Sequence, residues 1–142
     1  MVSVDNPVPE DFTSHYDRKE QGLVVDYIII MGYDEHYVGS DAGSVASLPW
    51  VEQGVQDTIT EVAPERTILA IPFYTRLWKT TGGAVTSEAI GMDEAQNVLG
   101  ANAVEPVWDG SVGQNYATFE QDNSTYQIWL EDAQSIAEKV KL

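Results

Sequence analysis

The sequence feature that most constrains the fold is an apolar run that stops abruptly at a polar cluster. Residues 24–31 read Val-Val-Asp-Tyr-Ile-Ile-Ile-Met, and Gly32 separates them from residues 33–37, which read Tyr-Asp-Glu-His-Tyr. A run of this length, rich in β-branched residues, predicts a strand that is buried on both faces. Because ligands bind at the carboxyl ends of parallel strands, we expect functional side chains within residues 33–37.

A helix and a second apolar strand are predicted after the first strand. Apolar residues recur at three- and four-residue steps between Pro49 and Val62, which indicates an amphipathic helix. Residues 67–74 then predict a second buried strand, with a polar tip at residues 74–76. Strand, helix and strand in this order indicate a parallel pair joined by a right-handed crossover. The small residues at 39–47 predict a flexible, exposed loop.

Two shorter elements are predicted ahead of the first apolar run. Residues 1–4 predict a short strand, and residues 11–22 predict a short helix with Asp11 as its cap and Gly22 at its end. Because the sequence opens on a strand and closes within a helical pattern, we expect the chain to be part of a larger protein.

The pattern of the sequence changes after Arg76. Short alternating segments broken by glycine predict antiparallel hairpin strands at 77–81, 84–90, 104–108, 116–120 and 126–130. A helix is expected at 92–99, and a last helix is expected within 132–142. The fold class is therefore α/β, with a second subdomain built from antiparallel hairpin strands and a helix.

The composition excludes several classes of partner. Among the 142 residues, Asp and Glu outnumber Lys and Arg 23 to 7, which argues against nucleic acid and anionic membranes as partners. No run approaches the ~18 apolar residues that a spanning helix needs, so no membrane insertion is expected. The sequence has no Cys, and His15 and His36 have no partners at metal-ligand spacing. Residues 109–120 lack the glycine of a calcium loop and predict a hairpin turn instead. We expect neither a metal nor a cofactor.

The tetrapeptide Met31-Gly32-Tyr33-Asp34 resembles the end of the sixth barrel strand of glycoside hydrolase family 18. Other segments resemble further landmarks of that family in the same order: Asp26-Tyr27, residues 72–76, and residues 129–136 with Lys139. Residues 34–36 and 16–19 look most like the bacterial branch that contains spore-associated, peptidoglycan-acting enzymes. The resemblance covers essentially the whole chain.

The resemblance implies a (β/α)8 TIM barrel that this chain covers only in part. Residues 1–76 would form about strands five to seven, residues 77–130 a small α+β insertion subdomain, and residues 131–142 a returning barrel helix. A full barrel needs about 250 residues. The catalytic signature of the family, Asp-x-x-Asp-x-Asp-x-Glu, occurs nowhere in the sequence. We therefore expect the isolated chain to be inactive. From the likeness to the spore-associated branch, we expect the parent protein to be extracytoplasmic: secreted, cell-wall or spore-associated.

The resemblance also implies hydrolysis of β-1,4 bonds next to N-acetylglucosamine, in peptidoglycan or chitin. In this family the acetamido group of the substrate attacks the anomeric carbon, with retention of configuration. Tyr33 and Asp34 match the positions that hold and polarise this group, and they are the expected catalytic residues. Met31 is expected to line the floor of the site. The residues expected to bind substrate are Met31, Tyr74, Arg76 and Trp78.

The same residues have plainer interpretations. Asp34 could cap a loop, Tyr33 could be a core aromatic residue, and the tryptophans after Arg76 could form a small core of their own. For the chain as a whole, the alternatives are a non-catalytic, lectin-like glycan-binding module of the same fold and an acidic scaffold domain. Uncovered sheet edges also predict self-association, which sedimentation at high concentration would test.

Overall fold

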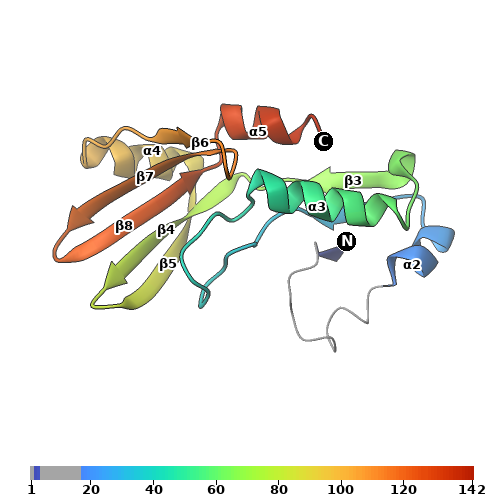
Figure 1. The fold of residues 1–142 in the computed structure, drawn as a ribbon, viewed down its shortest axis with the longest axis horizontal. Coiled ribbons are helices and arrows are strands. Elements are labelled where there is room, and N and C mark those ends of the chain that lie inside the picture. Colours follow the sequence, from blue (N-terminus) through green and yellow to red (C-terminus); the bar gives the residue numbers. More distant parts are fainter. Residues whose placement is uncertain (1, 4–16) are drawn as a thin grey trace.

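Two β-sheets organise the fold of the computed structural model, which describes residues 2–3 and 17–142 (Figure 1). The three-stranded sheet has the order β1-β2-β3, and the five-stranded sheet has the order β5-β4-β8-β7-β6. The strands of the first sheet are β1 (Val2–Ser3), β2 (Ile28–Met31) and β3 (Thr67–Ala70). Figure 1 shows this sheet and α3 on the right and the five-stranded sheet on the left.

The predicted parallel pair is confirmed. β2 pairs in parallel with β3, from Ile28 opposite Thr67 to Met31 opposite Ala70. Helix α3 (Leu48–Ile59) and the 3-10 helix η1 (Pro64–Arg66) lie between the two strands in the chain. The buried residues of this core come from one face of β2 and from α3 with the turn after it: Ile28, Ile30, Val55 and Val62. The other face of β2 is only half-buried, so burial on both faces was not fully realised.

The second apolar run forms parts of two strands and not one. β3 ends at Ala70, and Tyr74 begins β4 (Tyr74–Thr81) in the other sheet. Pro72 lies between them and has no backbone N–H to donate to a strand ladder, which is consistent with the interruption. Tyr74 and Arg76 therefore belong to the five-stranded sheet and are not the tip of β3.

Helix α2 (Arg18–Val24) overlaps the predicted N-terminal helix but has other ends. Its cap is Asp17, whose side chain accepts a hydrogen bond from Glu20 N at 2.9 Å. Gly22 lies inside the helix and does not end it; a Cβ at Gly22 would approach a Val62 methyl to 3.2 Å. The predicted cap Asp11 lies outside the described residues.

The predicted hairpin strands after Arg76 are confirmed within a few residues. They are β5 (Ala84–Gly91), β6 (Val107–Asp109), β7 (Gln114–Gln121) and β8 (Ser124–Leu130), and all pairs in this sheet are antiparallel. Helix α4 (Met92–Ala101) covers one face of the sheet through buried residues: Ile90, Ala95, Leu99, Ala117, Ile128 and Leu130. Helix α5 (Ala133–Lys139) follows β8.

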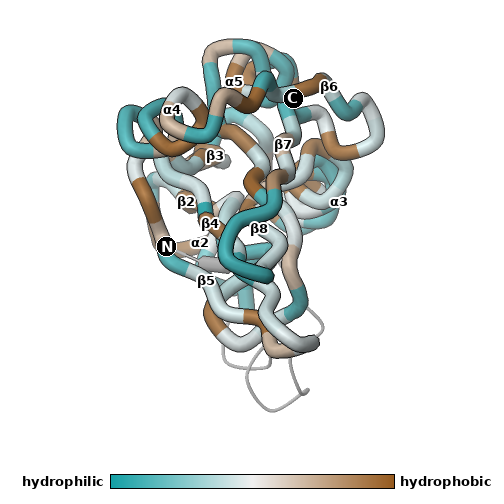
Figure 2. Tube along the Cα trace, turned by 90° about the vertical axis from the view of Figure 1, so that its left-hand side faces the viewer, coloured by the Kyte–Doolittle hydropathy of each residue, from teal (hydrophilic) through white to brown (hydrophobic). Residues whose placement is uncertain are grey.

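The surface differs between the two ends of the molecule. The β7–β8 turn is strongly hydrophilic, with Glu-Gln-Asp-Asn at residues 120–123 (Figure 2). Near α2, by contrast, Leu23 and Val24 are 71% and 83% exposed. β3 is an outer strand of the parallel sheet as far as the structure describes it. Self-association through such an edge stays a prediction. In the described part of the chain, no helix is long and apolar enough to cross a membrane.

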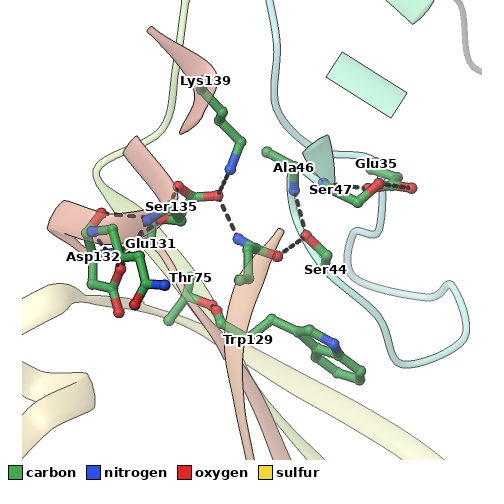
Figure 3. Close-up of polar contacts among 12 residues, drawn as sticks. Glu35, Ser44, Ala46, Ser47, Thr75, Trp129, Glu131, Asp132, Ser135 and Lys139 are labelled. Atoms are coloured by element: carbon green, nitrogen blue, oxygen red, sulfur yellow. Dashed lines mark hydrogen bonds and ion pairs between the residues drawn. The ribbon is translucent and has the colours of Figure 1, made fainter. Parts of the chain in front are cut away.

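A buried polar network joins α5, the five-stranded sheet and the loop that follows β2 (Figure 3). The carboxylate of Glu131 accepts from Lys139 Nζ at 2.6 Å and from Ser135 Oγ at 3.0 Å. The Gln114 amide nitrogen donates to the same carboxylate, and the Gln114 amide oxygen accepts from Ser44 Oγ. The chain thus brings together side chains that are far apart in the sequence.

The ion pair at the centre of this network is fully buried. Glu131 and Lys139 are each 1% exposed. Burial raises the pKa of Glu131 above its usual range, and the Lys139 ammonium and the hydrogen bonds from Ser135 and Gln114 oppose that shift. A charge at this depth is costly unless it is paired and hydrogen-bonded, so each partner depends on the other.

The loop at 39–47 was predicted to be flexible and exposed, and this is wrong for its second half. Residues 43–47 are all buried, and Val45 and Ala46 are 0% exposed. Val45 and Ala46 pack with Val51 of α3 in a small apolar cluster, while Ser44 enters the polar network. Small residues suit this segment because they fit between closely packed elements.

Replacing one partner of the buried pair should strongly destabilise the fold. Lys139→Met leaves the Glu131 carboxylate buried without its cation, so we expect the free energy of unfolding to fall by about 3–5 kcal/mol, measured by urea denaturation. Lys141→Met is the control, because the Lys141 ammonium also lies 2.6 Å from a carboxylate, that of Glu138, but is 63% exposed. It should cost less than about 1 kcal/mol. Equal losses in the two variants would contradict this assignment.

Candidate active site

Tyr33 and Asp34 follow the carboxyl end of β2, directly after the last residue that pairs with β3. Gly32 N donates to the Ala70 carbonyl at 2.8 Å, which continues the pairing with β3 one residue past Met31. A Cβ at position 32 would lie 2.7 Å from Leu69 Cδ1 and 3.1 Å from the Ala70 oxygen. Only glycine allows the backbone at position 32 to lie this close to β3, directly before Tyr33 and Asp34.

Asp34 adopts a backbone conformation that few side chains favour. Its φ is +68°, in the left-handed region. Asp enters this region more readily than most residues, but the conformation still costs on the order of 1 kcal/mol and persists only where other contacts maintain it. The carboxylate of Asp34 is exposed and accepts a hydrogen bond from the Tyr74 hydroxyl.

Tyr74 connects the two predicted catalytic residues. Its ring meets the Tyr33 ring edge-on, with centroids 6.3 Å apart and an interplanar angle of 73°. Burial raises the pKa of Tyr74 well above its usual range, and the hydrogen bond to Asp34 and the Asp34 charge raise it further, against the opposing charge of Arg76. Tyr74 is therefore a neutral hydroxyl donor at physiological pH, and it orients one carboxylate oxygen of Asp34.

Met31 and Arg76 were also expected to bind substrate. Met31 is the last residue of β2 and is half-buried. Arg76 lies two residues after Tyr74 on β4, and therefore on the same face of the strand. Its Nε donates to Ser87 Oγ at 2.9 Å, and its guanidinium lies 5.8 Å from the centroid of the Trp78 ring. Its side chain is thus held between β5 and Trp78.

Trp78 was expected to bind substrate, and the structure contradicts that expectation. Trp78 is 1% exposed, and its indole N–H donates to the Gly43 carbonyl at 2.9 Å. A ring that is covered in this way cannot stack on a sugar. Trp78 instead packs the five-stranded sheet against the buried half of the loop at 39–47. The error follows from treating that loop as exposed.

Contacts that the sequence interpretation missed fix the segment directly after Asp34. Glu35 N donates to the Val45 carbonyl at 2.9 Å. The Glu35 carboxylate accepts from Ser47 N at 2.7 Å and from Ser47 Oγ at 2.9 Å (Figure 3). His36 Nδ1 donates to the Ser44 carbonyl at 2.8 Å. The available signal was a serine at the start of an amphipathic helix, which is a preferred cap residue, together with a second carboxylate next to Asp34.

Metal chemistry has no evident ligand set in this region. Within residues 2–3 and 17–142, no group of three or more His, Asp or Glu side chains lies close enough to hold an ion. The side chains of the site offer a carboxylate, phenols and a guanidinium, which bind polar groups by hydrogen bonds.

A sequence profile identifies the family. The profile of "Glycosyl hydrolases family 18" matches residues 2–142, so the chain belongs to this family, as the residues around Asp34 predicted.

Particular relatives extend the comparison. The chain is 24% identical over 134 residues to "Uncharacterized glycosylase YvbX" of Bacillus subtilis (strain 168), with 94% of this chain and 39% of the relative covered. It superposes on the Bacillus cereus spore cortex-lytic enzyme SleL with a TM-score of 0.86 at 22% identity, over 97% of this chain and 33% of SleL. A chitinase from Chromobacterium violaceum ATCC 12472 gives a TM-score of 0.80 at 24% identity, over 96% and 44%. The chain thus spans less than half the length of each of these proteins, and the solved structures support a mixed α/β fold like theirs.

The Tyr74–Asp34 hydrogen bond should be visible in the titration of Tyr74. Asp34→Asn removes a negative charge that raises the pKa of Tyr74, so we expect that pKa to fall toward its ordinary value of 10.0. The measurement is a pH titration by NMR of protein with 13C-labelled tyrosine ring carbons, with Tyr74→Phe to assign the resonance. Asp122→Asn is the matched control, since Asp122 is also exposed and has a φ of +50°. An unchanged Tyr74 titration in Asp34→Asn would show that the bond is absent in solution.

Proposed function

We propose that this chain supplies the acetamido-binding side of an active site that hydrolyses β-1,4 bonds next to N-acetylglucosamine. The observation that carries the proposal is the group of Tyr33, Asp34 and Tyr74 at the carboxyl end of β2, with Asp34 held by the Tyr74 hydroxyl. Membership of glycoside hydrolase family 18 supports a glycosidase. The likeness to a spore cortex-lytic enzyme and to a chitinase supports a substrate of the peptidoglycan or chitin type.

In the proposed mechanism, the oxygen of the substrate's acetamido group forms a bond to the anomeric carbon. The glycosidic bond breaks at the same carbon, and the leaving oxygen takes a proton from a general acid. Asp34, oriented by Tyr74, accepts a hydrogen bond from the acetamido N–H and stabilises the positive charge of the resulting oxazolinium ion. The Tyr33 hydroxyl donates to the acetamido oxygen and holds it toward the anomeric carbon. Water then opens the oxazolinium ion, which completes hydrolysis with retention.

The general acid of this mechanism belongs to a motif that this sequence does not contain. The family signature Asp-x-x-Asp-x-Asp-x-Glu occurs nowhere in the 142 residues. We propose that the parallel sheet, within residues 1–76, is part of a (β/α)8 barrel, that residues 77–130 form the α+β insertion, and that residues 131–142 return to the barrel. Because β4 begins at Tyr74, the five-stranded sheet starts within the proposed barrel segment and supplies a residue of the site.

Peptidoglycan is the favoured polymer, because SleL is described as acting on spore cortex and is similar over 97% of this chain. An extracytoplasmic place, in the cell wall or in the spore, follows from that substrate. A lectin-like role is the second candidate, since a chain that holds the acetamido group and lacks the acid would bind glycan without cutting it.

Glycan binding by the isolated chain tests this proposal. Titration with N-acetylglucosamine oligomers or with muropeptides should shift the NMR signals of residues 31–36 and of Tyr74. Asp34→Asn should weaken binding at least about tenfold, the value of one hydrogen bond to a charged group. Asp122→Asn, in the distant β7–β8 turn, should leave the affinity unchanged. Failure of both ligands to shift any signal would instead favour an acidic scaffold domain.

Hydrolysis by the isolated chain distinguishes binding from catalysis. Because no residue of the acid signature is present, we expect no turnover of an aryl N-acetylglucosaminide above the rate of a Tyr33→Phe, Asp34→Asn double variant. Fluorescence of the released aryl group provides the measurement. Turnover that depends on Asp34 would mean that another residue of this chain donates the proton.

A further inference from the structure

We propose that Glu35 is a positioning residue, which holds Asp34 in its left-handed conformation facing Tyr74 by clamping the backbone after Asp34 onto Ser47. The inference rests on the proposed function for its relevance to glycan binding, but its structural part can be tested separately. Asp34 needs such a restraint, because a φ of +68° is unfavourable for a residue with a side chain.

The geometry of the clamp fixes both the main chain and the side chain of Glu35. Glu35 N, in the peptide bond that follows Asp34, donates a hydrogen bond to the Val45 carbonyl at 2.9 Å. Each carboxylate oxygen of Glu35 has its own donor: Oε2 accepts from Ser47 N at 2.7 Å, and Oε1 accepts from Ser47 Oγ at 2.9 Å. The residue that follows Asp34 is therefore held at two points.

A carboxylate suits this clamp better than a neutral group. Ser47 is the cap residue of α3, yet its own side chain makes no capping hydrogen bond. The Glu35 charge instead lies at the amino-terminal end of a twelve-residue helix, where the helix dipole favours an anion. An amide in place of the carboxylate could accept from Ser47 N and donate its NH2 group to Ser47 Oγ, but it would lack the charge that the helix end favours.

The segment that Glu35 contacts is buried and hydrogen-bonded to the rest of the fold. Ser47 is 6% exposed, and Val45 and Ala46 beside it are 0% exposed. Ala46 N also donates to Ser44 Oγ at 2.9 Å, and Ser44 is bonded to Gln114 in the buried network. A restraint from such an anchor can maintain a strained neighbour, which a mobile loop could not do.

Glu35 is not placed to act as an acid or a base itself. Both of its oxygens accept hydrogen bonds from Ser47, whereas the exposed carboxylate next to Tyr74 is that of Asp34. Glu35 therefore acts through Asp34 and not on a substrate.

The test is the titration of Tyr74 in the 142-residue chain. Burial is the largest cause of the raised pKa of Tyr74, and the nearby Asp34 carboxylate raises it further. In Glu35→Ala both contacts with Ser47 are lost and Asp34 is freed to leave its conformation, so we expect the pKa of Tyr74 to fall relative to wild type. Ser47→Ala removes one of the two donors and should produce a smaller fall. Ser47→Thr keeps both donors and should restore the wild-type titration. Glu52→Ala, at an exposed glutamate on α3, should change nothing.

A purely structural role would lower stability without moving this titration. If Glu35→Ala is folded and Tyr74 titrates as in wild type, the proposal is wrong. If Glu35→Ala does not fold, the Ser47→Ala and Ser47→Thr pair decides in the same way, since loss of a single hydroxyl in a folded protein must still move the Tyr74 titration.

Glycan affinity gives the functional consequence. Glu35→Ala should weaken binding of an N-acetylglucosamine oligomer, in the same direction as Asp34→Asn, while Glu52→Ala binds as wild type. If the wild-type chain binds neither oligomers nor muropeptides, the proposed function fails, and the Tyr74 titration still decides the positioning role. If wild type binds and Glu35→Ala binds equally well, the positioning role fails and the proposed function stands.

Discussion

The buried carboxylate of Glu131 is the constraint on which much of this structure depends. It lies where β8, β7 and α5 meet, and its charge is tolerated only because Lys139, Ser135 and Gln114 all donate to it. Gln114 also accepts a hydrogen bond from Ser44, so the loop after β2 is connected through hydrogen bonds to Glu131, near the C-terminal end of the chain. A hydrophobic contact in this place would tolerate sliding, whereas hydrogen bonds to a buried charge require particular distances and directions.

That constraint explains how a loop of small residues can support a site. Fixing Ser44 leaves Val45 and Ser47 in set positions, and these are the residues that Glu35 contacts. The same loop covers Trp78, whose indole N–H is bonded to the Gly43 carbonyl. Rigidity in this region therefore comes from polar contacts made across the chain, and not from regular secondary structure.

Local patterns predicted the local parts of the fold. The β-branched run ending in Met31 predicted β2, the helical spacing of apolar residues predicted α3, and alternation with glycine predicted the hairpins, because each signal lies within about ten residues. Residues 31–34, together with further motifs in the same order along the chain, indicated the family and the roles proposed for Tyr33 and Asp34. The burial of Trp78 was not predictable in this way, since its partner Gly43 is 35 residues distant. The clamp at Glu35 had only the cap serine and the second carboxylate as signals, and neither says that the two residues meet. Pro72 did carry a local signal that the strand should stop, and giving it more weight would have placed Tyr74 in β4.

The position of Tyr74 has a consequence for how the site responds to its surroundings. Tyr74 is the first residue of the five-stranded sheet, while Asp34 follows a strand of the parallel sheet, so one hydrogen bond has its donor and its acceptor on separately built units. The Tyr74 hydroxyl orients the Asp34 carboxylate only while the two sheets keep their relative position. Any event that tilts one sheet against the other changes, at this bond, the direction of a single carboxylate oxygen atom.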